Sequence, residues 1–116
     1  MNIQHFLQVS KEISLNFMQQ NYLEQRDLKI LEHIYINSDN PNSCLTVNDV
    51  IGTEYLGSRA TIHRGLHRLR ESDVIEFFNQ SGNYRTKFLR PSKIAINYFR
   101  KLEVGMLESA KLSRSR

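Results

Sequence analysis

The chain has few of the residues that cross-link or interrupt a small fold: one cysteine, two prolines and no tryptophan among 116 residues. Because Cys44 is alone, an internal disulfide and a thiolate metal cluster are both excluded. We expect a reduced thiol near the start of a short strand. Redox sensing is the alternative, and it would require an accessible and activated thiol.

Long apolar runs are also absent. No segment approaches the roughly 20 apolar residues that cross a bilayer, and the opening residues MNIQHF lack the basic start and apolar stretch of a signal peptide. We therefore expect no membrane association and a cytoplasmic protein.

Groupings typical of catalysis are missing too. The sequence has no glycine-rich phosphate loop, no serine nucleophile elbow and no acidic pair at useful spacing. His63 and His67 are spaced i, i+4, which can ligate a metal, but no carboxylate or thiol nearby in sequence completes a site. We expect neither an enzyme nor a bound metal or cofactor.

Charge is present but unevenly distributed. Residues 1–57 carry three basic and seven acidic side chains, a net charge of −4. Residues 58–116 carry thirteen basic and five acidic side chains, a net charge of +8. A basic second half beside an acidic first half favours one surface made for a polyanion. The alternative is a solvated basic surface with no partner.

Hydrophobic periodicity predicts a mainly α-helical fold with a small antiparallel β-sheet. Helices are expected over residues 2–20, 23–37, 47–54, 58–72 and from 92 to about 110. A turn-rich segment follows the second helix at 38–43. Short strands are expected at 44–46, 74–78 and 84–89, the last two joined by a hairpin loop at 79–83. This order, helix, tight turn, helix, hairpin, is that of a winged helix-turn-helix.

The helix over residues 58–72 carries the strongest functional pattern. Ile62, Leu66 and Leu69 are spaced i, i+4, i+7 and are expected to face the core. The outer face then has no acidic residue before Glu71. The B-DNA major groove admits a helix, and arginine can bridge guanine O6 and N7 there. The residues expected outward are Arg59, Ala60, Thr61, His63, Arg64, His67 and Arg68.

Two further features accompany this helix. Gly65 is unusual in a helix interior; either it allows close approach by the third helix or by a phosphate, or it is a tolerated imperfection. In the hairpin, Arg85 and Lys87 are two apart and so point from the same sheet face. They predict a wing that contacts phosphates or the adjacent minor groove. Phe88 alternates with them and is expected to pack inward.

These residues resemble the MarR family of bacterial transcription regulators over residues 26–96. LTVNDV at 45–50 is similar to the family's Leu-Thr-x-x-Glu-Leu, and GSRATIHR at 57–64 to its Ser-x-x-Thr-Val-x-Arg recognition helix. LRESDVIE at 69–76 resembles Leu-Glu-x-x-Gly-Leu-Ile, and NYR at 83–85 resembles Asp-x-Arg in the wing. Asp73 stands where glycine is common, and only about 25 residues follow the wing, where the family usually has two helices.

The resemblance implies a homodimer that binds a pseudo-palindromic operator, often as a repressor released by a small phenolic or other ligand. It divides the chain into an N-terminal dimerisation helix (1–22), a DNA-binding domain (23–91) and a C-terminal dimerisation helix with a frayed basic tail (92–116). It also implies a place at the bacterial nucleoid.

We therefore expect a sequence-specific regulator whose partners are double-stranded DNA and a second copy of the chain. A small-molecule effector stays open. The alternatives are a plasmid or phage replication or partition protein, and a winged-helix module for protein–protein interaction. The expected DNA-binding residues are Thr46, Ser58, Arg59, Ala60, Thr61, His63, Arg64, His67, Arg68, Asn83, Arg85 and Lys87.

Overall fold

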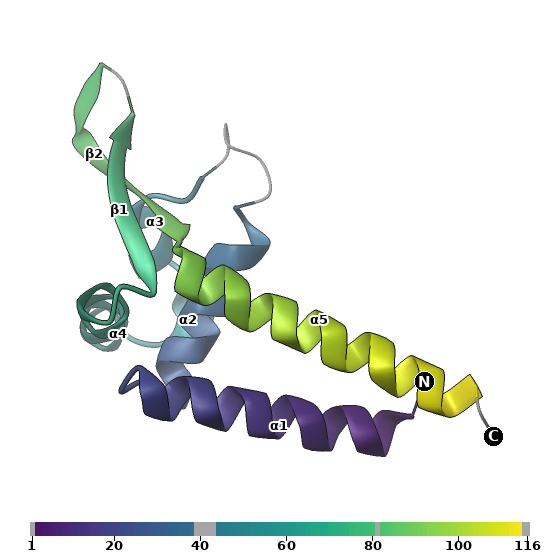
Figure 1. The fold of residues 1–116 in the computed structure, drawn as a ribbon. Coiled ribbons are helices and arrows are strands. Elements are labelled where there is room, and N and C mark those ends of the chain that lie inside the picture. The colour runs from purple at the N-terminus through teal and green to yellow at the C-terminus, as the bar shows by residue number, and fades with distance from the viewer. Residues whose placement is uncertain (1, 39–43, 81, 115–116) are drawn as a thin grey trace.

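The computed structural model describes residues 2–38, 44–80 and 82–114 of the chain. The elements follow one another as α1, α2, α3, the 3₁₀ helix η1, α4, the hairpin β1–β2 and α5. Figure 1 shows the hairpin projecting at one end and α1 and α5 running side by side at the other. The mainly helical architecture with a two-stranded antiparallel sheet confirms the predicted fold class. Most of the predicted turn at 38–43 lies outside the described residues.

The first two helices begin at polar caps. α1 (Ile3–Gln20) starts where the Asn2 side chain accepts the backbone N–H of His5 at 3.1 Å. α2 (Gln25–Ile36) starts at Glu24, whose backbone N–H donates to the Asp27 carboxylate at 2.8 Å. Asp27 has no exposed surface, so this cap lies inside the protein.

The helix expected at 47–54 is shorter and is divided. α3 spans Val47–Ile51, and a separate turn, η1, spans Glu54–Leu56. α4 (Arg59–Glu71) follows after Gly57, whose φ of 127° lies in a region that side chains rarely adopt. Val50, Ile51 and Leu56 are buried, so α3 and η1 anchor the turn that leads into α4.

The wing consists of β1 (Ile75–Gln80) and β2 (Asn83–Pro91). The strands are antiparallel, with Phe77 opposite Leu89 and Phe78 opposite Phe88. The expectation that Phe88 packs inward is wrong. Leu89 is the fully buried residue, whereas Phe88 is half-buried on the other face, with its ring centre 5.7 Å from that of Phe78.

The terminal helices α1 and α5 (Lys93–Arg114) pack antiparallel. We call this pair the terminal arm. At its far end the backbone N–H of Asn2 donates to the carbonyl of Ser109 at 3.2 Å, and His5 Nδ1 lies 2.8 Å from Ser109 Oγ. Near the core, the Phe17 and Tyr98 rings stack with centroids 4.1 Å apart.

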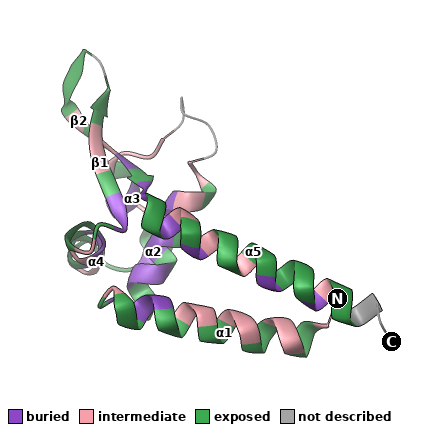
Figure 2. Cartoon of the chain, in the orientation of Figure 1, coloured by how far each residue is buried: buried purple, intermediate pink, exposed green. Residues whose placement is uncertain are grey.

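One continuous core joins these parts (Figure 2). Its fully buried large side chains come mainly from α2, α4 and the wing: Ile30, Leu31, Ile34, Ile62, Leu69, Ile75 and Leu89. The terminal arm joins this core through buried residues near the end of α1 and the beginning of α5, which are Phe17, Met18, Ala95 and Tyr98. Its half-buried residues Ile13, Phe99 and Leu102 also pack against the core. None of the described helices is long and apolar enough to cross a membrane. The core therefore holds α4 against α2, while most of the arm extends away from it.

Candidate nucleic-acid interface

Two of the hydroxyl-bearing residues expected in the interface, Thr46 and Ser58, cap the N-termini of helices. Thr46 Oγ1 accepts the Asp49 backbone N–H at 3.1 Å, and the Asp49 carboxylate accepts the Thr46 N–H at 2.9 Å. Ser58 Oγ accepts the Thr61 N–H at 3.2 Å and lies 2.9 Å from the Thr61 hydroxyl. Ser58 is exposed and Thr46 half-buried. Their first role is therefore to fix the starts of α3 and α4.

The outer face of α4 is exposed along its length. It consists of Arg59, Ala60, His63, Arg64 and His67. At 3.6 residues per turn, Arg64 lies about 200° round the helix from the buried Ile62, so it points away from the core. Among the described residues, no carboxylate lies within ion-pair distance of Arg59 or Arg64. These two charges are available to an external anion.

One weak ion pair lies at the C-terminal end of this face. His67 Nε2 lies 3.9 Å from a Glu71 carboxylate oxygen, and both side chains are well exposed. An exposed pair of this kind contributes little to stability. Within the described residues, no group of three or more histidine, cysteine or acidic side chains is placed to hold a metal ion.

Arg68 does not lie on the outer face, which corrects the expectation that it points outward. Its Nε and Nη2 atoms each donate to Asp27 at 2.8 Å, and Glu24 lies 3.6 Å away. The hydrogen bond with Asp27 is the main reason that the pKa of Arg68 is raised; burial opposes it. The guanidinium thus holds α4 against α2, and its two bonded nitrogens are not free for an external ligand.

Gly65 explains how the two helices come so close. A Cβ on Gly65 would lie 2.5 Å from Ile30 Cδ1 and 3.0 Å from Asp27 Oδ1. The expectation of close approach was right in kind but wrong in partner, because the neighbour is α2 and not the third helix or a phosphate.

The wing presents two of its three cations, Arg85 and Lys87, toward α3 and α4. Arg85 and Lys87 are exposed, and a cavity of about 230 Å³ lies between them and the residues Thr46 and Asn48. Asn83 is used locally, since its side-chain oxygen accepts the Thr86 N–H at 3.3 Å. The structure therefore brings Arg85 and Lys87 to the same side of the molecule as the start of α3.

Sequence reasoning missed Arg70. This exposed residue at the end of α4 places its guanidinium 4.6 Å from the centre of the Phe77 ring in β1. It follows His63 by seven residues and so lies on the same side of the helix. The spacing of Arg70 from His63 could have indicated in the sequence that Arg70 belongs to the exposed side of α4. Its contact with Phe77 could not, because Phe77 belongs to β1.

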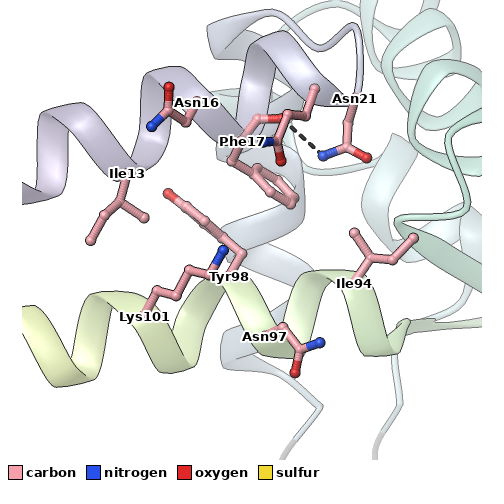
Figure 3. A pocket seen from close by; sticks show the side chains of 9 residues that line it. Ile13, Asn16, Phe17, Asn21, Ile94, Asn97, Tyr98 and Lys101 are labelled. Atoms are coloured by element: carbon pink, nitrogen blue, oxygen red, sulfur yellow. Dashed lines mark hydrogen bonds between the residues drawn. The ribbon is translucent and has the colours of Figure 1, made fainter.

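A second cavity lies at the root of the terminal arm. It measures about 330 Å³, and Figure 3 shows α1 and α5 side chains meeting around it. Burial raises the pKa of the Tyr98 hydroxyl, partly offset by its hydrogen bond with Ser14. Among the polar groups at this cavity are Asn16, Asn97 and Lys101.

Solved structures of transcription regulators share this fold. The Staphylococcus aureus MepR–DNA complex aligns with a TM-score of 0.62 and 16% identity, over 90% of this chain and 84% of that chain. MarR aligns with a TM-score of 0.60 and 17% identity, over 95% and 76%. A MepR variant bound to an oligodeoxyribonucleotide aligns with a TM-score of 0.63 and 17% identity, over 96% and 80%.

At these identities the likeness establishes a MarR-like winged-helix fold. No family model matches the sequence, and no curated protein matches it significantly.

Proposed function

We propose that this chain is a double-stranded-DNA-binding transcriptional regulator. In this proposal α4 enters the major groove, and the wing contacts the backbone or the adjacent minor groove. The observation that carries it is the outer face of α4, where exposed arginines and histidines occur without an acid before Glu71. A helix exposed only for solubility usually mixes charges of both signs.

The charges on α4 suit base reading. Arg64 points away from the core, and arginine forms the commonest specific contact, with guanine O6 and N7. Arg59 and His63 are exposed on the same helix. Ala60 leaves room for close approach and can contact a thymine methyl group. Arg68 is left out of this set because it is bonded to Asp27.

The wing supplies sequence-independent contacts. Arg85 and Lys87 are exposed on a hairpin that stands beside α3 and α4 (Figure 1). Contacts of this kind to phosphates position a protein on the duplex without reading its sequence. Their loss is therefore expected to weaken specific and random duplexes to similar degrees.

A homodimer is part of the proposal. The terminal arm leaves large apolar side chains exposed, among them Ile3, Leu7, Val104 and Leu107, with 53–59% of their surface accessible. A two-fold dimer formed through this surface would present two copies of α4 to half-sites about one helical turn apart.

The most detailed parts of the proposal are repression and release by an effector. The 330 Å³ cavity between the helices of the arm could accept a small ligand with polar groups facing Asn16, Asn97 and Lys101. A ligand there would contact both helices of the dimerisation arm and could change the spacing of the two copies of α4. A bacterial regulator of this kind would act at the nucleoid in the cytoplasm.

The experiment is a fluorescence-anisotropy titration of a labelled random-sequence duplex across a salt series. The affinity should fall steeply with salt, because neutralising phosphates releases counterions. A flat dependence would contradict DNA binding and favour the protein-interaction module. Genomic footprinting would then separate a regulator from a replication or partition protein.

Sequence reading is tested with one variant and its control. Arg64→Ala should cost about 1–3 kcal/mol on a duplex selected from a random pool. Arg26→Ala removes the same charge from the exposed surface of α2, outside α4, the wing and the arm, and should leave the affinity within about twofold. Equal losses in the two variants would mean that α4 does not read bases.

A further inference from the structure

A second feature of the basic surface lies between α4 and the wing. A cleft of about 260 Å³ separates the two elements. Its apolar wall is formed by Val47, Leu66 and Phe77. Its remaining lining is basic, and consists of His63, His67, Arg70 and Lys87.

Arg70 is held at this cleft by an aromatic ring. Its guanidinium carbon lies 4.6 Å from the centre of the Phe77 ring, and Phe77 in turn packs against the core. Stacking of this kind orients the guanidinium and leaves its N–H donors at the edge of the plane. Among the described residues no carboxylate lies within ion-pair distance of Arg70. The oriented guanidinium of Arg70 thus faces the cleft without a carboxylate partner among the described residues.

The acids near the cleft are directed elsewhere. Glu76 of β1 bonds to Arg90 at 2.8 Å. Asp49 accepts the Thr46 N–H in the cap of α3. Glu71 reaches the cleft only at its margin, 3.9 Å from His67. No carboxylate belongs to the residues that line the cleft, so its potential is positive.

Lys87 connects this cleft with its neighbour. It lines both the 260 Å³ cleft beside Arg70 and the 230 Å³ cavity beside Arg85. Three cations therefore follow one another from the end of α4 along β2. When a helix lies in the major groove and a wing reaches the adjacent minor groove, the strand between the two grooves must pass over this row.

We propose that the cleft between α4 and the wing is a seat for one DNA phosphodiester, and that Arg70 is its principal ligand. Lys87 adds a second charge, and the imidazoles of His63 and His67 border the same space. The proposal rests on the proposed DNA-binding function and extends it to Arg70, whose contact is with the backbone and not with a base.

The test compares two variants that remove one positive charge each. For each copy of the chain that is bound, Arg70→Gln should lower affinity for a random duplex about five- to tenfold near 100 mM salt and reduce the slope of log affinity against log salt by about 0.9, so a bound dimer should lose about 1.8 from the slope. Arg26→Gln, on the exposed surface of α2 and outside the arm, should change neither. Arg70→Lys should keep the slope and lose part of the affinity. Thermal melts of all three variants establish that the fold is intact.

The source of the phosphate is tested separately. On a duplex selected from a random pool, one methylphosphonate is moved along each strand. At one position in each half-site it should weaken the unmodified protein about five- to tenfold, the loss expected from one copy of Arg70→Gln, and should not weaken Arg70→Gln further. If no position behaves in this way, the phosphodiester assignment is wrong. If inorganic phosphate alone shifts the Arg70 Nε–H resonance and saturates at low millimolar concentration, the cleft serves a free anion instead.

The two levels of the proposal fail differently. If the unmodified protein shows no salt-dependent DNA binding, both the proposed function and the phosphodiester seat are wrong. If it binds DNA and Arg70→Gln binds with the same affinity and slope, only the seat is wrong.

Discussion

Two helix–helix contacts in this protein are each built on a glycine, and they differ in what surrounds them. Gly65 places α4 against α2, and Gly105 places α5 against α1. The first contact is enclosed by side chains without exposed surface, including Ile30 and Asp27. The second contact is made with the half-buried Val9, on an arm that also leaves large apolar side chains exposed.

The difference indicates what each contact does. Around Gly65 the buried ion pair and the core together leave α4 one orientation, so its outer face has a defined direction. Around Gly105 the helices pack closely, but the apolar surface beside them remains accessible, with Ile3 at 57%. A rigid contact positions a binding surface, while an incompletely covered one is suited to receive a partner.

The largest effect is expected from the ion pair below α4. Asp27→Asn leaves Arg68 without its bidentate acceptor and should lower the free energy of unfolding by about 3 kcal/mol, the lower end for a buried pair because Arg68 is 30% exposed. Urea denaturation at fixed protein concentration measures it. Glu24→Gln is the control; this exposed partner lies 3.6 Å from Arg68 and should cost less than about 1 kcal/mol. Equal costs would mean that the buried pair does not hold α4.

Alanine at the two glycines tests the comparison directly. At Gly65 the new Cβ overlaps Ile30 inside the closed core, which costs about 1–3 kcal/mol. Improved helix propensity returns up to about 1 kcal/mol, so a net loss is expected. At Gly105 the overlap is with the half-buried Val9, at 2.9 Å, and α5 can shift. Gly105→Ala should therefore be nearly neutral. Similar thermal melts for the two variants would remove the distinction between the contacts.

A charged substitution on the exposed surface of the arm tests whether that surface forms a dimer. Leu107→Asp should raise the dimer dissociation constant at least tenfold, or about 1.4 kcal/mol, because a carboxylate would be buried between two copies. Sedimentation equilibrium measures this. Ile36→Asp is the control, since Ile36 is 71% exposed at the end of α2 and outside the arm. A protein that is monomeric at tens of micromolar would show that the arm has no second copy as partner.

The smallest effect concerns the turn after α4. Asp73 has a φ of 57°, which costs an L-residue about 1 kcal/mol or more. Asp73→Gly removes this cost but increases the entropy of the unfolded chain, so a gain of about 0.5 kcal/mol is expected. Asp73→Ala, which keeps the backbone cost and loses the aspartate side chain, should not stabilise. A stabilising alanine would place the effect outside the backbone.

Much of the fold was predictable from local pattern. The i, i+4, i+7 spacing of Ile62, Leu66 and Leu69 identified both the helix and its inner side, because helical period and burial are coupled within one segment. The cap at Ser58 was likewise visible in the sequence. The end of α3 at Ile51 and the separate turn η1 were not visible, since so few residues offer too little helical period to read.

The sequence by itself determined which helix has a basic outer face and which strands form the wing, since both depend on residues that are neighbours along the chain. Only the tertiary structure decided which partners the arginines at the boundary of that face contact. Arg68 turns to Asp27, 41 residues away, and Arg70 turns to Phe77 of the wing. The packing of one face of the hairpin against the helices decided that Leu89, and not Phe88, is buried. A side chain at the edge of a helix or strand face can turn either way, and only a partner brought in from another element selects one of the two directions.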